Sequence, residues 1–117
     1  MRLNEVDYDG RRPVDGYGPG FFRIDGRVYR GSVAVLPEGP RMWGGYDDTA
    51  TLLAVAEQVD VLLIGTGVEI APLPRAFRQL LEDAGLGLEI MATGAACRTY
   101  NVLLGEGRRI GAALLAV

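Results

Sequence analysis

Histidine and lysine are absent from this chain of 117 residues, so all twelve basic residues are arginine. Ser32 is the only serine and Cys97 the only cysteine. A Ser–His–Asp triad or a Cys–His pair therefore cannot form within one chain. Schiff-base chemistry and a P-loop both need a lysine that the chain lacks. These absences exclude the commonest nucleophilic mechanisms.

The same absences bear on metals and redox chemistry. Without histidine, one cysteine cannot build a transition-metal site of the usual kind. A carboxylate site for Mg²⁺ or Ca²⁺ remains open, although no acidic stretch has the spacing of a ligand loop. A lone cysteine also excludes an internal disulfide, so the fold does not require an oxidising compartment. We expect no cofactor and no metal.

Charge and hydropathy limit the partners. The net charge is −3, which provides no basic surface for nucleic acid and disfavours adhesion to an anionic membrane. The first seven residues are acidic and have no apolar core, unlike a signal or transit peptide. The longest apolar runs, about eight residues, are far shorter than the ~20 that span a bilayer. We expect a cytoplasmic protein without membrane insertion.

The length predicts a single domain over residues 1–117. Residues 1–20 are polar, rich in glycine and interrupted by Pro13 and Pro19. We interpret them as a largely irregular arm, apart from a short strand near residues 6–8. The next segment has the clearest hairpin signal, because Asp25-Gly26 separates two β-rich runs, 21–24 and 27–30.

The rest of the chain is organised around residues 61–64, a run of four large apolar side chains. Such a run between turn residues is typical of a strand buried on both faces. The other predicted elements alternate with it. A strand at 33–36 and a loop at 38–46 come first. Asp47 or Asp48 caps a helix with an apolar stripe of Leu52, Val55, Ala56 and Val59. Pro72 and Pro74 open a second helix, whose stripe is Phe77, Leu80, Leu81 and Ala84. A strand at 88–91, a helix at 93–105 closed by Gly105, and a strand at 110–117 follow. This alternation predicts an α/β domain with a largely parallel sheet covered by helices and an N-terminal β-hairpin.

Several short motifs together resemble a known family. They are Gly16-Tyr17-Gly18-Pro19-Gly20-Phe21, Tyr29-Arg30-Gly31-Ser32, Leu36-Pro37, Trp43, the run from Leu62 to Gly67, Met91-Ala92-Thr93, the run from Arg98 to Leu103, and Glu106-Gly107-Arg108-Arg109. In this order and spacing the chain, from Gly16 onward, is similar to a family of small domains whose best-known members are mitochondrial complex I assembly factor 3 and the adipogenesis-associated domain protein.

The resemblance implies a three-layer fold with a central mixed sheet of five strands, helices packed on it and an additional β-hairpin. It implies no established catalytic residues, and it favours another protein as the partner. The chain has no long N-terminal extension of the kind that a mitochondrial precursor carries, so we do not expect organellar import.

The first candidate site is Gly65-Thr66-Gly67, which follows the buried strand at the carboxyl edge of the predicted sheet, where α/β folds place their ligands. Its backbone amides could hold an anion. The loop lacks the GxGxxG pattern, so a tight turn is the alternative.

The helix at 93–105 supplies the second candidate. Arg98 and Asn101 share a helix face, while Thr99 points elsewhere. We expect this face, with Thr93 at the helix start, to form one wall of a crevice beside Gly65–Gly67. The alternative is that Thr93 only caps the helix and Arg98 is only an exposed charge.

Three further features have two interpretations each. Cys97 is either a thiolate favoured by the helix dipole or a small buried residue, and the second is favoured because no base can assist it. Arg108 and Arg109 bind a partner or belong to a solvated turn. Trp43 covers the core or anchors another protein.

Two functions from different classes remain. The first is a non-catalytic binding or assembly module, acting through a surface near the carboxyl edge of the sheet. The second is a small enzyme, or a binder of a small anionic ligand, that uses Gly65–Gly67, Thr93, Arg98 and Asn101.

Overall fold

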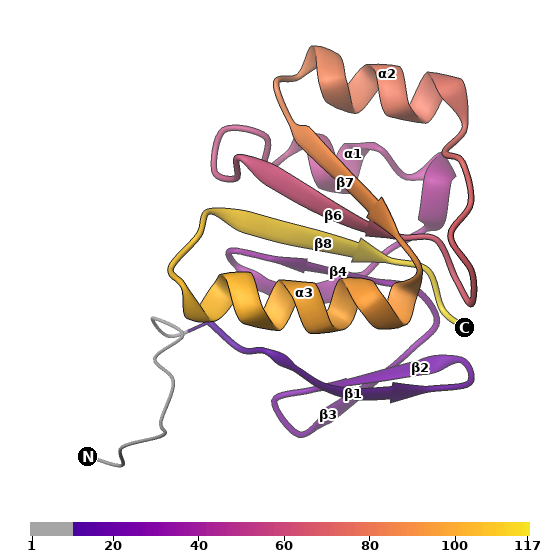
Figure 1. The fold of residues 1–117 in the computed structure, drawn as a ribbon, viewed down its shortest axis with the longest axis vertical. Helices are drawn as coiled ribbons and strands as arrows, with labels where there is room; N and C mark the ends of the chain where they lie inside the picture. The colour runs from indigo at the N-terminus through magenta and orange to yellow at the C-terminus, as the bar shows by residue number, and fades with distance from the viewer. Residues whose placement is uncertain (1–10) are drawn as a thin grey trace.

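A computed structural model describes residues 11–117, so the short strand expected at residues 6–8 lies outside the described residues. The centre of the molecule is a five-stranded sheet (Figure 1). The order across it is β5 (Gly39–Met42), β4 (Val33–Leu36), β8 (Ile110–Leu114), β6 (Val61–Gly65) and β7 (Gly87–Met91). β6 is parallel to β7 and β8, whereas β4 is antiparallel to β8 and β5. The sheet is therefore mixed, as expected, with its parallel pairs in one half.

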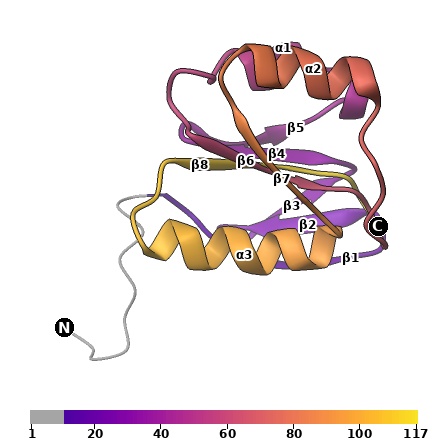
Figure 2. The same cartoon turned by 45° about the horizontal axis from the view of Figure 1, so that its top comes forward.

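Both faces of this sheet are buried. Along β6, Leu62 and Ile64 belong to one hydrophobic cluster and Leu63 to the other. The short helices α1 (Ala50–Leu53) and α2 (Arg75–Asp83) cover the first face. The longer helix α3 (Thr93–Gly105) covers the second face beside a small sheet, so the molecule has the predicted three layers (Figure 2).

The small sheet consists of β1 (Val14–Gly18), β2 (Phe21–Ile24) and β3 (Arg27–Arg30), all antiparallel. The predicted hairpin is confirmed: Asp25 and Gly26 have φ values of 52° and 76°, as a type I′ turn requires. The prediction of an irregular arm up to residue 20 was wrong for β1. The composition of β1 does not favour a strand. Its pairing with β2 and its packing on α3 nevertheless outweigh this weak intrinsic preference.

Four local predictions also need correction. Residues 38–46 are not all loop, because β5 pairs with β4 and carries Pro40 at the sheet edge, where proline is tolerated. α1 ends at Leu53 and is shorter than the predicted stripe, although Leu52, Val55 and Val59 of that stripe are buried. On α2 only Phe77 and Leu81 are buried, while Leu80 and Ala84 are exposed.

The fourth correction concerns the end of α3. α3 spans 93–105 as predicted, but the glycine of its C-terminal motif is Gly107, whose φ is 73°, rather than Gly105. The N–H groups of Gly107 and Arg108 donate to the carbonyls of Leu104 and Leu103, which is the Schellman pattern. The N-cap residue of α1 is Thr49, which makes no side-chain capping bond, but Asp48 just before it accepts hydrogen bonds from both the N–H and the hydroxyl of Thr51. In the part of the chain that the structure describes, no helix has the length and apolar character needed to cross a bilayer.

Candidate functional site

A cavity of about 330 Å³ opens where β6 and β7 end and α3 begins. Because this is the carboxyl edge of the parallel strands, it is the position at which the sequence predicts a crevice. Gly67 and Arg98 both line it. The remaining lining residues are Tyr17, Val68, Ala92, Gly94, Ala95 and Val117. The structure thus brings together two of the predicted site residues.

Gly65 is buried under the first turn of α3 rather than open to the cavity. A Cβ at this position would lie 2.9 Å from both Cα and Oγ1 of Thr93. Only glycine therefore lets β6 pass this close to the helix. The carbonyl of Gly65 accepts a hydrogen bond from the N–H of Leu115 at 3.0 Å.

The Thr66 and Gly67 amides are engaged inside the protein. Thr66 donates its N–H to the carbonyl of Met91 at 2.9 Å. Gly67 donates its N–H to the hydroxyl oxygen of Thr93, also at 2.9 Å. The Thr66 hydroxyl fastens the following loop by donating to Glu69 O and accepting from Ala71 N–H. These two N–H groups are therefore not free to hold an anion, and the loop is a well-satisfied turn.

Thr93 does not cap α3, which corrects one of the two interpretations. It is the first residue of the helix, follows Ala92 at the N-cap position, and makes no side-chain capping bond. Its fully buried hydroxyl instead donates to the carbonyl of Leu115 at 2.8 Å while accepting from Gly67. This one hydroxyl ties together the β6 loop, α3 and the end of β8.

The exposed parts of the cavity are Arg98, Tyr17 and the loop after β6. A side chain at Gly94 would collide with the hydroxyl of Tyr17, so the glycine allows Tyr17 to lie over the start of α3. Around the opening, Val68 is 78% exposed and Ile70 in the same loop is 65% exposed. Val102, one turn of α3 after Arg98, is 61% exposed. Arg98 thus lines the cavity together with the exposed Val68, and it lies one turn of α3 before the exposed Val102.

Thr99 and Asn101 are outside this cavity. Asn101 accepts a hydrogen bond from the N–H of Val14 at 2.8 Å and donates to the carbonyl of Val14 at 2.9 Å. Its side chain therefore substitutes for a strand neighbour at the start of β1. Thr99 is half-buried on the same helix.

Trp43 covers the core and is not an exposed anchor. It is 4% exposed, donates its indole N–H to the carbonyl of Asp48, and packs against Tyr46 and Phe77. Cys97 is likewise a buried small residue. Burial raises the pKa of its thiol to about 11, and the nearby Arg98 opposes that shift only in part.

The two arginines of the turn before β8 differ. Arg109 donates to the carbonyls of Glu57 and Gln58 and lies 3.8 Å from a carboxylate oxygen of Asp60. Arg108 is exposed and lines a second cavity of about 170 Å³, together with Arg11 and Arg109. Within residues 11–117 no group of three potential metal-ligating side chains is present.

Sequence reasoning missed Tyr17, Val68 and Arg11. Tyr17 and Arg11 precede the hairpin in a segment interpreted as an irregular arm, and only the pairing of β1 brings them to α3. Val68 carried no local signal either, because Leu86 also follows a glycine with positive φ and is buried.

The chain is similar to a described family and to several known proteins. The model of a family described as "Protein of unknown function (DUF498/DUF598)" matches residues 14–115. An uncharacterised protein of Rhodobacter capsulatus is 52% identical over 115 residues, covering 98% of this chain and 93% of that protein. The NADH dehydrogenase [ubiquinone] 1 alpha subcomplex assembly factor 3 of Homo sapiens is 31% identical over 109 residues.

The match to the human assembly factor covers 87% of this chain but only 59% of that protein, so the chain spans little more than half of its length. Among solved structures, an outer membrane protein of Bartonella henselae has a TM-score of 0.84 and 42% identity, covering 95% of this chain and 99% of that one. The expected resemblance to complex I assembly factor 3 is thus confirmed, and the fold has a close experimental counterpart.

Proposed function

Because this chain belongs to the DUF498/DUF598 family, we propose that it is a non-catalytic protein-binding module that acts in the assembly of a respiratory NADH dehydrogenase. The observation that carries the proposal is the similarity to the human assembly factor across nearly the whole of this domain. The missing histidine and lysine, and the engagement of the Thr66 and Gly67 amides, also favour binding over catalysis.

The surface that we assign to the partner surrounds the cavity at the start of α3. It combines Tyr17, Gly67, Val68, Arg98 and Val102. Exposed apolar side chains around a hollow are typical of a protein interface, and an arginine among them is a residue type enriched at binding hot spots. Gly65 and Thr93 support this surface from below, since they hold the loop against α3.

The test uses the tagged full chain, expressed in its native cell, cross-linked and recovered for mass spectrometry. We expect subunits of the NADH dehydrogenase in the recovered material, and less assembled complex on a native gel when the gene is deleted. Val68→Asp and Val102→Asp should each reduce recovery, because a charge would have to lose its water on binding.

Val28→Asp is the matched control, because Val28 is also exposed, at 50%, but lies on β3 and lines none of the described cavities. It should leave recovery unchanged. Absence of NADH dehydrogenase subunits from the wild-type material would overturn the proposed function. Equal recovery with all three variants would overturn the assigned surface.

A further inference from the structure

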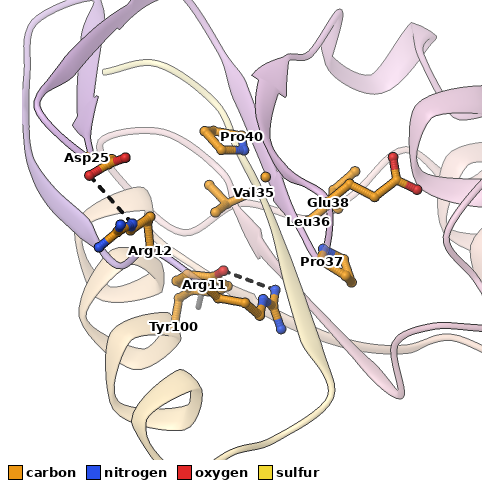
Figure 3. A pocket seen from close by; sticks show the side chains of 10 residues that line it. Arg11, Arg12, Asp25, Val35, Leu36, Pro37, Glu38, Pro40 and Tyr100 are labelled. Carbon is orange, nitrogen blue, oxygen red and sulfur yellow. Dashed lines mark hydrogen bonds and ion pairs between the residues drawn. The ribbon is translucent and has the colours of Figure 1, made fainter. Parts of the chain in front are cut away.

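A second hollow region lies at the opposite end of the sheet, where β6 and β8 begin and α3 ends. Arg11 lines two cavities there. One, of about 260 Å³, is also lined by Arg12, Asp25 and Glu38 (Figure 3). The other, of about 170 Å³, is lined by Arg11, Pro37, Gln58, Leu104, Gly107, Arg108 and Arg109. Three guanidinium groups border the smaller cavity, and none of the described residues that line it carries a carboxylate.

The charge of Arg11 is half-buried, and the acceptors that it finds among residues 11–117 are neutral. Its guanidinium donates to the hydroxyl of Tyr100 at 3.1 Å and to the carbonyl of Ile110 at 2.8 Å. It also lies 5.9 Å from the centre of the Tyr100 ring. Among the described residues no carboxylate pairs with it, and its Nε is buried without a hydrogen-bond partner. A cation removed from water in this way is stabilised by an anion.

Arg108 lines the same cavity, and its side chain makes no hydrogen bond to any described residue. Arg109, by contrast, is held by two carbonyls and by Asp60 and so acts in the structure of the turn. Gly107 fixes the backbone of Arg108, because the chain turns at Gly107 in the Schellman motif and the Arg108 N–H donates to the carbonyl of Leu103. Two of the guanidinium groups that line the cavity, those of Arg11 and Arg108, therefore have no carboxylate partner among the described residues.

We propose that the cavity between Arg11 and Arg108 is a binding site for a small oxyanion, the carboxylate or phosphate group of a low-molecular-weight ligand. Guanidinium groups hydrogen-bond such oxyanions with matched planar geometry, and the charge strengthens each bond. The size suits a small group, because 170 Å³ is below the usual range for larger organic ligands. The inference is independent of the proposed assembly role and of its surface at the other end of the molecule.

The neighbouring cavity beyond Arg11 does not share this property. Two carboxylates, of Asp25 and Glu38, line it beside Arg11 and Arg12, and Arg12 lies 3.5 Å from Asp25. The carboxylate of Glu38 points away from Arg11 (Figure 3). The described lining of this larger cavity therefore carries no net charge, unlike that of the smaller cavity, so its charge does not favour an anion.

The experiment is a ¹H–¹⁵N NMR titration of the full chain with inorganic phosphate and, separately, with glutarate, at constant ionic strength. We expect a saturable shift of the Gly107 amide and of the side-chain Nε–H signals of Arg11 and Arg108. Saturation by phosphate alone identifies a phosphate ester as the ligand class, and saturation by glutarate alone identifies a carboxylate. Arg108→Gln should raise the Kd about tenfold, since one charge-assisted contact is lost.

Arg75→Gln is the matched control: it removes the same charge from exposed α2, away from every described cavity, and should leave the Kd unchanged. Arg11→Gln should also weaken binding, with its melting temperature measured alongside because Arg11 supports Tyr100. The proposal is overturned if neither anion gives a saturable shift, or if Arg108→Gln binds as tightly as the Arg75→Gln control.

Discussion

Gly67 and Thr93 exchange two hydrogen bonds: the Gly67 N–H donates to Thr93 Oγ1 at 2.9 Å, and the Thr93 N–H donates to the Gly67 carbonyl at 2.8 Å. The same hydroxyl donates to the carbonyl of Leu115 at 2.8 Å. Because Thr93 is fully buried, water cannot replace these partners. The loop after β6, the start of α3 and the end of β8 therefore form one fixed unit beneath the cavity.

Thr93→Val tests this unit. Valine keeps the shape of threonine but cannot accept from Gly67 or donate to Leu115. We expect a loss of about 1–3 kcal/mol in the free energy of unfolding, because buried polar groups lose their partners. For a domain of this size that corresponds to a fall in melting temperature of roughly 5 °C or more.

Thr99→Val is the matched control, on the same helix but only half-buried and without a side-chain hydrogen bond in the described structure. It should stay within about 0.5 kcal/mol of wild type. Equal stability of the two variants, measured by urea unfolding, would show that the Thr93 hydroxyl contributes nothing.

Gly65→Ala tests the close approach of β6 to α3. The added Cβ would meet the backbone of Thr93, which cannot rotate away as a side chain could. We expect destabilisation of about 1–3 kcal/mol, the usual cost of overpacking. In Gly16→Ala the new methyl group would meet no atom within 4 Å, so thermal melting should show little change. A Gly65→Ala protein as stable as Gly16→Ala would contradict the packing described above.

Local sequence patterns were sufficient to predict most of the elements that form the core. The apolar run at residues 61–64 predicts a strand covered on both faces, and Asp25-Gly26 predicts a type I′ hairpin; both are confirmed. These signals are local because they depend on a continuous apolar run and on the backbone φ of two adjacent residues. β1 and β5 have no such signal, since Gly39-Pro40 and the glycines near Tyr17 disfavour strands. Their conformation comes from pairing with neighbours.

The site was less predictable for the same reason. Helical spacing correctly places Arg98 and Asn101 one turn apart, but only the path of β1 decides that Asn101 binds Val14 instead of facing a crevice. The crevice expected between Gly67 and Arg98 was predictable from their places at the carboxyl edge of the sheet, and the two residues do line one cavity. Arg11 and Arg108 lie near opposite ends of the chain, and no local pattern relates them before the fold brings them together.

The last prediction concerns Cys97 and alkaline pH. Burial raises the pKa of its thiol from 9.0 to about 11, so the folded protein keeps the thiol protonated at pH values where the unfolded chain has lost the proton. The unfolded state binds fewer protons in this window, and the free energy of unfolding must therefore fall as pH rises from about 9 to about 11. Below the window the full stabilisation is present, and above it the loss is complete.

Cys97→Ala removes this titration while leaving a small apolar side chain in the core. Tyr100, whose pKa burial also raises, titrates in both proteins and so cancels in the comparison. We expect the difference in urea midpoint between wild type and Cys97→Ala to shift against wild type between about pH 8 and about pH 10.5. The native thiol should also react far more slowly with a disulfide reagent at about pH 8 than the unfolded chain does, because the thiolate is the nucleophile. A midpoint difference that is constant across this range, with rapid labelling of the folded protein, would show that Cys97 ionises as freely as an exposed thiol.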